Sequence, residues 1–413
     1  MKILLSSLFL FSISSLNASV PEITGPLSGD VRANQVTLWM YAPLNSKCSF
    51  SYHAEGASET DKKTGVLKAI SNQAAKGQGQ IFKSALDGLS PNTSYRYQVY
   101  IGGKSDSDWK GSFKTAPVEG KSTAFRMAIT SCMKIGKPQG SWNLLLAEKP
   151  DFHLTVGDTH YADTTDPTIQ LQHHVAYRRE KEFANVLRNI PIYAIWDDHD
   201  YGPNNSDGTA MGKESSLVGW KQAWPNPASG TSDTPGTFFK FSRGDVDFFV
   251  VDGRYYRDPN ELPDDENKRK LGDAQFEWLI NGLKSSKAQF KVIASGSTLH
   301  HSKTDGWRIF TFSRHRLFDA IKENKISGVI YVSGDMHKSL VWEHHESKRV
   351  GYPLVEVMSS GITNGRDLSF ATIDFDTTVE DPTARVRIIY GKGEKINTDK
   401  TWKLSQLRQS NNR

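Results

Sequence analysis

The chain has 413 residues, of which 37% are hydrophobic and 11% aromatic, and its formal net charge is +5. This length exceeds the roughly 250–300 residues at which single hydrophobic cores usually stop growing, so more than one domain is expected. The small basic excess suits an anionic ligand but is too modest to indicate a nucleic-acid-binding protein.

The N-terminus has the features of a secretory signal peptide. Met1 and Lys2 form a short positive region, and an apolar stretch from Ile3 to Ile13 leads to small residues near Ala18. A stretch this short indicates a cleaved signal rather than a membrane span. A retained lipid-facing anchor is the alternative. We therefore expect residues 1–18 to be removed, and the mature protein to be periplasmic or secreted without a transmembrane segment.

Residues 19–117 are predicted to form an all-β domain. Apolar and polar side chains alternate over 35–41 and 95–99, and residues 48–53 form another expected strand. Tyr95 is placed like the tyrosine corner of a Greek-key sandwich. The domain resembles fibronectin type III domains. We expect it to pack on the rest of the chain as a structural unit, and a sugar- or partner-binding role is the alternative.

Four apolar runs after this domain each end in side chains that can ligate metal ions. The runs and their tips are 125–132 with Cys132, 152–158 with Asp158 and then Tyr161, 190–196 with Asp198 and His199, and 328–335 with Asp335 and then His337. Such runs are typical of buried strands, and ligands collect beyond the carboxyl ends of strands in open α/β sheets. A lone Gly-Asp after a strand is more often a turn or a helix cap. Because gathered carboxylates repel one another unless a cation offsets them, the four tips together predict a metal site.

Helices alternate with strands along residues 122–390, which we expect to form one α/β domain. Apolar residues on one face predict a helix over 169–190, so that the strands on either side of it are parallel. His173 and His174 in this helix are expected to be solvated or to lie behind the site. Further helices are predicted over 273–284 and 313–322, and further strands over 246–252, 291–297, 353–358, 371–375 and 384–390. The polar, basic residues 391–413 are predicted to form a solvated tail.

The motif order resembles that of the PhoD-like alkaline phosphatases, a branch of the calcineurin-like metallophosphoesterases. The motifs are Ser-Cys, Gly-Asp-x-x-Tyr, Trp-Asp-Asp-His-Asp and Ser-Gly-Asp-x-His. The tyrosine three residues after Gly-Asp is also similar, more remotely, to purple acid phosphatases. The resemblance spans roughly residues 124–390. It implies the α/β class, as a four-layer α/β/β/α sandwich preceded by the small all-β domain.

The resemblance also implies a two-metal site bridged by Asp158. Cys132, Tyr161 and His337 would complete the ligands of the first metal, Fe³⁺. A metal-bound Cys132 would be protected from oxidation outside the cell. The alternative is a disulfide with Cys48, which would require the two domains to abut there.

Asp198 and Asp335, with water molecules, would hold the second metal. Oxygen ligands favour a hard ion such as Ca²⁺, Mg²⁺ or Mn²⁺ over Zn²⁺. Ordinary calcineurin-like enzymes carry Asn and His at these two positions. Because both changes remove soft ligands and add negative charge, Ca²⁺ is the favoured second ion.

Three residues are expected to act on the substrate. His199 would protonate the leaving alkoxide or stabilise charge on the phosphoryl oxygens. Asn205 lies in a predicted long loop, 202–239, and with its neighbour Asn204 could bind phosphate, ligate, or only form a turn. Arg254 could grip phosphate through two hydrogen bonds, or instead pair with Asp252. Many metallophosphoesterases carry a ligating histidine near His300 and His301, which leaves that role open for either.

These expectations favour an exported, metal-dependent alkaline phosphatase that hydrolyses phosphate esters with metal-activated water. The first alternative is a phosphodiesterase that acts on teichoic acid, phospholipid or nucleotide diesters with the same site. The second is a non-catalytic protein that binds phosphate or a surface through its all-β domain. The partner expected in the first two cases is a phosphate ester.

Overall fold

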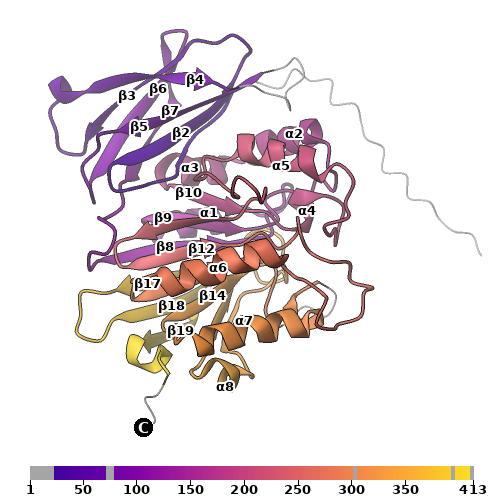
Figure 1. The fold of residues 1–413 in the computed structure, drawn as a ribbon. Coiled ribbons are helices and arrows are strands. Elements are labelled where there is room, and N and C mark those ends of the chain that lie inside the picture. The colour runs from indigo at the N-terminus through magenta and orange to yellow at the C-terminus, as the bar shows by residue number, and fades with distance from the viewer. Residues whose placement is uncertain (1–22, 71–78, 301–304, 392–395, 410–413) are drawn as a thin grey trace, which may run out of the picture.

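The computed structural model describes residues 23–70, 79–300, 305–391 and 396–409. An all-β domain lies at one end of the molecule, against a larger domain of helices and sheets (Figure 1). The predicted signal peptide, residues 1–18, lies outside the described residues. Within the described part of the chain, no helix is long and apolar enough to cross a membrane.

The N-terminal domain is a seven-stranded sheet in the order β1-β2-β5-β4-β3-β6-β7. Its strands are β1 Thr24–Gly29, β2 Gln35–Ala42, β3 Cys48–Ala54, β4 Lys63–Ala69, β5 Gln80–Asp87, β6 Ser94–Ile101 and β7 Lys104–Lys114, with a 3-10 turn at η1 Glu59–Asp61. Alternate residues of β2 and β6 face one shared core. The Tyr95 hydroxyl accepts a hydrogen bond from the Ser90 backbone N–H at 2.8 Å, as expected of a tyrosine corner.

The first sheet of the larger domain has the order β10-β9-β8-β17-β18-β19. The strands are β8 Ala124–Thr130, β9 Phe152–Val156, β10 Ile192–Ile195, β17 Ser369–Asp376, β18 Thr383–Tyr390 and β19 Ile396–Lys403. β8, β9 and β10 are parallel, as the crossover pattern predicts. Their carboxyl ends therefore lie at the same edge of the sheet.

The second sheet has the order β11-β12-β13-β14-β16-β15. The strands are β11 Phe239–Arg243, β12 Val246–Val250, β13 Phe290–Ala294, β14 Val329–Ser333, β15 Leu340–Glu343 and β16 Val355–Met358. β12, β13, β14 and β16 are parallel. The two sheets pack face to face, since the ring of Phe125 in β8 lies 6.4 Å from that of Phe248 in β12.

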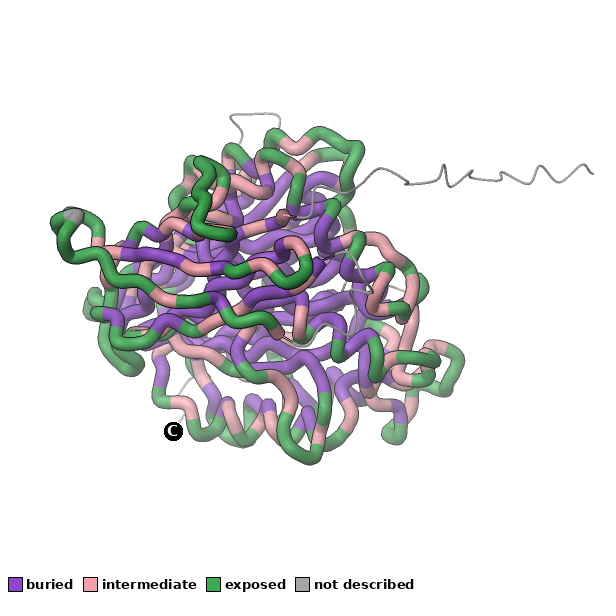
Figure 2. The backbone as a smooth tube through the Cα atoms, turned by 90° about the horizontal axis from the view of Figure 1, so that it is seen from above, coloured by how far each residue is buried: buried purple, intermediate pink, exposed green. Residues whose placement is uncertain are grey.

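Helices cover the outer face of each sheet. They are α1 Ser141–Ala147, α2 Pro167–Tyr177, α3 Lys181–Asn189, α4 Asp198–Tyr201, α5 Lys213–Ala223, α6 Asp273–Ser285, α7 Thr311–Glu323 and α8 Ser347–Val350, with 3-10 turns at η2 Trp307–Ile309 and η3 Leu404–Leu407. Trp142 of α1 contacts His153 of β9, and Trp278 of α6 contacts Phe249 of β12. The central strands are buried and the exposed positions lie outside them (Figure 2). The α/β class with a preceding all-β domain is confirmed.

Three predicted elements are wrong in part. The helix expected over 169–190 is two helices, α2 and α3, separated by a turn at 178–180. The loop expected over 202–239 contains α5, which buries Trp220. The tail expected over 391–413 contains β19 and η3, with Trp402 buried. β19 lies at the edge of its sheet, and its exposed charged residues Asp399, Lys400 and Lys403 concealed the buried position of Trp402.

The all-β domain is joined to the larger domain through buried groups. The Tyr193 hydroxyl donates to the Val31 carbonyl oxygen at 2.9 Å. The Trp39 indole N–H donates to the Gln222 carbonyl oxygen, also at 2.9 Å. The side chain of Trp39 belongs to the same apolar cluster as the core of the larger domain. The expectation that this domain packs as a structural unit fits these contacts.

Candidate functional site

The strand tips meet at two groups of ligand-type side chains. Ligand atoms of Cys132, Asp158 and His337 lie within 4.8 Å of one another, and so do those of Asp158, Asp198 and His199. Cys132 and Asp158 follow the neighbouring parallel strands β8 and β9. His337 comes from the second sheet, after β14. Asp158 belongs to both groups, which makes it the point where they join.

Tyr161 completes the first group. Its hydroxyl lies 3.4 Å from Asp158 Oδ2 and 3.3 Å from His337 Nε2. Cys132 Sγ donates to the same Asp158 oxygen at 3.2 Å. Asn364 Nδ2 donates to the Tyr161 hydroxyl at 2.9 Å, a contact that sequence reasoning missed. Asn364 lies in an irregular segment after β16, where no periodic pattern or motif marks it.

The backbone at these residues is left-handed, although none is glycine. The φ angles are 58° at Cys132, 52° at Asp158, 74° at Asp335 and 52° at His337. Such conformations cost energy and cluster at functional sites, where the surrounding structure holds them in place. Gly157 also has positive φ, and a Cβ there would lie 2.3 Å from the Cβ of Asp197. A glycine is therefore required where β9 and β10 deliver their carboxylates.

The buried charge at Asp158 lacks compensation. Burial raises the pKa of this carboxyl well above its usual value, and Cys132, Asp198 and Asp197 raise it further. Asp158 Oδ1 is buried and has no hydrogen-bond partner in the described part of the chain. Burial likewise raises the pKa of the Cys132 thiol. A cation at this point would offset the repulsion and give the free oxygen a partner.

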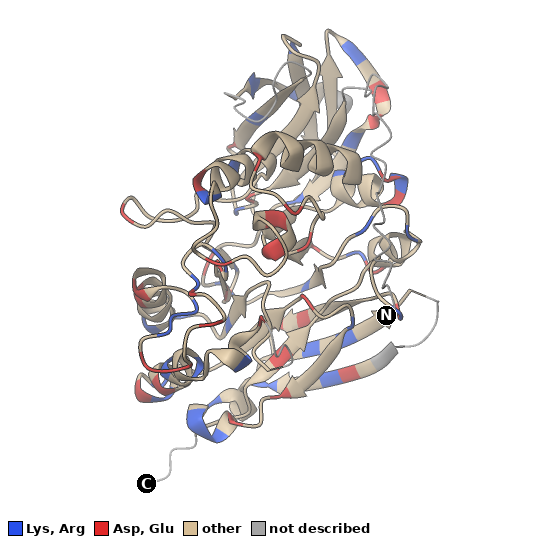
Figure 3. Ribbon diagram, turned by 90° about the vertical axis from the view of Figure 1, so that its right-hand side faces the viewer, with Lys and Arg blue, Asp and Glu red and all other residues tan. Residues whose placement is uncertain are grey.

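The second group is anchored by the short helix α4, whose acidic residues lie near the centre of the view in Figure 3. Asp198 Oδ2 accepts a hydrogen bond from the Asn205 backbone N–H at 2.8 Å. His199 Nδ1 lies 2.5 Å from Asp163 Oδ1, which fixes the orientation of the imidazole. Asn205 is exposed, so its side chain is accessible to a ligand. Whether its amide acts on substrate stays a prediction.

Arg254 lies beside a third group, which consists of Asp197, Asp305 and Asp335. The guanidinium is fully buried, lies 2.6 Å from Asp197 Oδ1 and pairs closely with Asp305. Burial opposes its charge, but Asp197 and Asp305 raise its pKa well above the usual value. Its contact with Asp252 is made by the backbone N–H, at 2.9 Å. As placed here, Arg254 holds carboxylates in position.

Asp335 falls into this third group, and Asp198 of the second group is also one of its charged neighbours. Burial and the nearby Asp197 and Asp305 raise the pKa of Asp335 well above its usual value. Its Oδ2 is buried and has no hydrogen-bond partner among residues that the structure describes. The unpartnered oxygens of Asp158 and Asp335 are hard ligands, whereas Cys132, Tyr161 and His337 are of mixed type. This donor set fits two different cations.

The remaining candidate residues lie elsewhere. His300 is close to His344 and His345, and His301 is outside the described residues. His174 is buried and contacts His160 and Trp224, which places it behind the strand tips rather than in solvent. Cys48 and Cys132 are both buried and free, Cys48 in the all-β domain, so the disulfide alternative does not hold.

Comparisons with known proteins agree with this fold. The family described as PhoD-like phosphatase matches residues 127–394. Alkaline phosphatase D of Bacillus subtilis (strain 168) is 24% identical over 432 residues, covering 88% of this chain and 73% of that protein. The solved structure of PhoD matches with a TM-score of 0.73 at 18% identity, covering 92% of this chain and 88% of that one. Purple acid phosphatase PPD1 from yellow lupin (Lupinus luteus) seeds matches with a TM-score of 0.69 at 13% identity, covering 92% and 74%. These two structures share the fold of this chain.

Proposed function

Because this chain belongs to the PhoD-like phosphatase family and is therefore a phosphoesterase, we propose that it is an exported, metal-dependent alkaline phosphatase. The observation that carries the proposal is the position of Asp158, which is shared by two groups of ligand-type side chains. One carboxylate shared by two groups suits a pair of neighbouring cations, which two-metal phosphatases use.

The donor set supports an assignment of the metals. Cys132, Tyr161, His337 and Asp158 would hold Fe³⁺, and Asp158, Asp198 and Asp335 would hold Ca²⁺, with Mg²⁺, Mn²⁺ or Zn²⁺ as alternatives at the second position. When bound, such a pair lowers the pKa of water and neutralises charge on a phosphoryl group.

The chain's own residues would bind and orient the phosphate ester. The charge of Lys134, an exposed residue whose Nζ lies 5.2 Å from the Tyr161 ring centroid, favours an anion at the mouth of the site. Asp163 fixes His199 through Nδ1 and leaves Nε2 to protonate the leaving oxygen. Arg254 keeps Asp197 and Asp305 in place and acts as a positioning residue.

Metal analysis combined with hydrolysis assays at alkaline pH tests the proposal. The mature protein should contain iron and calcium, show a visible Tyr161–iron absorption band, and hydrolyse aryl monophosphates. Asp158→Ala should lose turnover, whereas Asp233→Asn, at an exposed position, should keep it. His199→Ala should lower turnover by about 100-fold or more, with the metals retained.

Each alternative predicts a different result. Faster hydrolysis of aryl diesters than of monoesters would favour the phosphodiesterase. Stoichiometric zinc with full activity would overturn the preference for hard ions. A folded protein that is reconstituted with both ions and has no turnover would support the binding-only alternative. Cell fractionation with N-terminal sequencing tests export, and a mature N-terminus near Ser19 is expected.

A further inference from the structure

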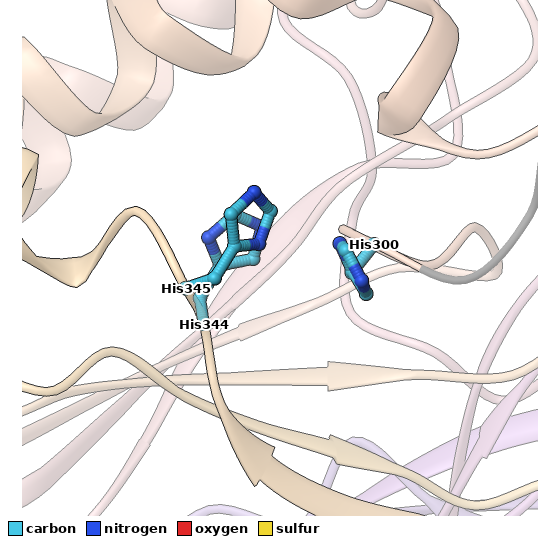
Figure 4. Close-up of side chains that lie close together, drawn as sticks. All are labelled: His300, His344 and His345. Atoms are coloured by element: carbon cyan, nitrogen blue, oxygen red, sulfur yellow. The ribbon is translucent and has the colours of Figure 1, made fainter.

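Three histidines form a separate cluster. His300 follows β13, and His344 and His345 follow the edge strand β15. One ring nitrogen from each histidine lies within 4.8 Å of those of the other two. The rings of His344 and His345 stack with centroids 4.6 Å apart, and the His300 ring lies 4.7 Å from that of His345 (Figure 4). Two segments that are 44 residues apart in sequence thus bring three imidazoles together.

His344 is the buried member of this cluster. Its side chain is packed against Phe318 of α7, and the residue is only 2% exposed. Nδ1 accepts a hydrogen bond from the Glu346 backbone N–H at 3.1 Å. Nε2 has no hydrogen-bond partner within the described ranges. A buried nitrogen left in this way is uncommon in a folded protein, so no protein group competes with a ligand for Nε2 among the described residues.

The cluster is electrically suited to a cation despite its basic neighbours. Burial, His345 and Arg314 lower the pKa of His344 to about 3, and burial and His345 lower that of His300. The charge of Arg314 is offset by Glu346, which lies 2.9 Å away and also contacts His315. Arg308 is the other cation that acts on His300, and it is exposed.

We propose that His300, His344 and His345 bind a divalent transition-metal ion of the Zn²⁺ type, at a site separate from the catalytic groups. Neutral imidazoles prefer Zn²⁺, Cu²⁺ or Ni²⁺ to Ca²⁺ or Mg²⁺. Three histidines leave one coordination position to water. His345 is exposed, which gives the ion a path of entry.

Binding would change the tautomer of His344. Because Nδ1 accepts the Glu346 N–H, the neutral ring carries its proton on Nε2. Ligation through Nε2 requires the ring proton on Nδ1, which can then no longer accept from the Glu346 N–H, so this contact must open when the ion binds. The tautomer is therefore a readout that a purely structural histidine cluster does not give.

The ion would also stabilise the segment 295–300, which follows β13. In this segment, the Leu299 backbone N–H donates to Glu356 at 2.8 Å, and Gly296 packs against Asp197, where a Cβ would lie 2.4 Å from the carboxyl carbon. Metal at His300 would join the described segment 295–300 to the turn after β15. We expect Zn²⁺ to raise the melting temperature through this contact.

Zinc titration of the full mature chain, with any affinity tag removed, tests the site. Wild type should bind one more Zn²⁺ per chain than either His345→Ala or His300→Ala. In the two variants, the affinity of this site for Zn²⁺ should fall by about 100-fold or more. His53→Ala, which removes a histidine from the all-β domain, is the matched control and should bind as wild type does. In ¹⁵N NMR, zinc should move the His344 proton from Nε2 to Nδ1 in wild type but not in His345→Ala.

Equal zinc stoichiometry and affinity in wild type, His300→Ala and His345→Ala would overturn the proposal, and so would an unchanged His344 tautomer in zinc-loaded wild type. The result is independent of the proposed function. His345→Ala loaded with iron and calcium should hydrolyse phosphate esters at the wild-type rate, and Asp158→Ala should keep the additional zinc site.

Discussion

The strand tips and the junction between the domains both leave buried polar atoms without hydrogen-bond partners among the described residues, and the charges of the two regions are opposite. At the strand tips the unpartnered atoms are carboxylate oxygens of Asp158 and Asp335. At the junction between the domains they are all three guanidinium nitrogens of Arg178. The Arg178 guanidinium lies 4.6 Å from the ring centroid of Trp39 and 4.1 Å from that of Trp224.

This difference shows when a missing hydrogen bond indicates a ligand. The negative faces of two indole rings stabilise Arg178, although burial lowers its pKa to about 9. Asp158 has no such compensation, because burial and its anionic neighbours all raise its pKa. At the junction, protein groups alone stabilise the buried positive charge, whereas at the strand tips the buried negative charge needs an external cation.

The largest effect is expected from Asp158→Asn. The amide keeps the shape of the side chain but removes the charge that would be shared between two ions. Turnover should fall by about 1000-fold, since loss of several kcal/mol of charge stabilisation corresponds to about three powers of ten. The metal-free variant should be more stable than metal-free wild type at pH 8, because it lacks a buried repulsive carboxylate. Steady-state kinetics and urea unfolding check the two parts, and lower stability of the metal-free variant would contradict the argument.

Arg178→Ala should lower the free energy of unfolding and leave turnover nearly unchanged, which is the opposite of Asp158→Asn. It removes two cation–π contacts and leaves a cavity between the indole rings, so we expect a loss of about 3 kcal/mol in the free energy of unfolding. Turnover per folded molecule should stay within about 3-fold of wild type. Arg179→Ala changes the exposed neighbour and is the control, for which little effect is expected. A large loss of turnover in folded Arg178→Ala would mean that the junction takes part in catalysis.

The sequence was sufficient to predict which residues lie at the strand tips, but not which residues contact them. Cys132, Asp158 and Asp198 follow apolar runs directly, so their position at one edge of a parallel sheet follows from local pattern and topology. Asn364 and Asp305 contact the site from irregular segments, where no spacing specifies a neighbour. The two carboxylates that Arg254 holds are 57 and 51 residues away from it in sequence. Such long-range pairs are set by packing.

Elements at the surface were missed for a related reason. α5 begins after Gly212, in a segment rich in Gly, Pro and Ser, so its buried Trp220 falls within a predicted loop. β19 carries exposed charged residues on both of its faces, Asp399 and Lys403 on one and Lys400 on the other, which obscured the alternation. Local propensity is weak in both, and burial against the rest of the domain decides the conformation.

Metal removal should destabilise the strand tips and leave the junction unaffected. A ligand present at 100 times its dissociation constant stabilises a protein by about 2.7 kcal/mol, so chelation should cost about 2–3 kcal/mol. The pKa values of Asp158 and Asp335 are raised, so the folded metal-free protein binds more protons than the unfolded chain. Its stability should therefore fall as pH rises above the usual carboxyl range. Urea unfolding from pH 5 to 9 measures this, and Arg178→Ala should show the same chelation cost as wild type.

The smallest expected effect is a pH dependence at the junction itself. Lys83 Nζ donates to the Trp224 carbonyl oxygen at 2.8 Å, and burial lowers its pKa to about 8. Between this value and the usual 10.5, the unfolded chain holds the proton that the folded protein has lost, so stability rises with pH there.

Relative to Lys83→Met, wild type should gain about 1–2 kcal/mol in the free energy of unfolding between pH 7 and 10, a figure reduced for the partial exposure of the side chain. Lys68→Met, at an exposed position paired with Lys83 across β4 and β5, is the control. An equal trend in both variants would mean that the Lys83 ammonium is solvated in the folded protein.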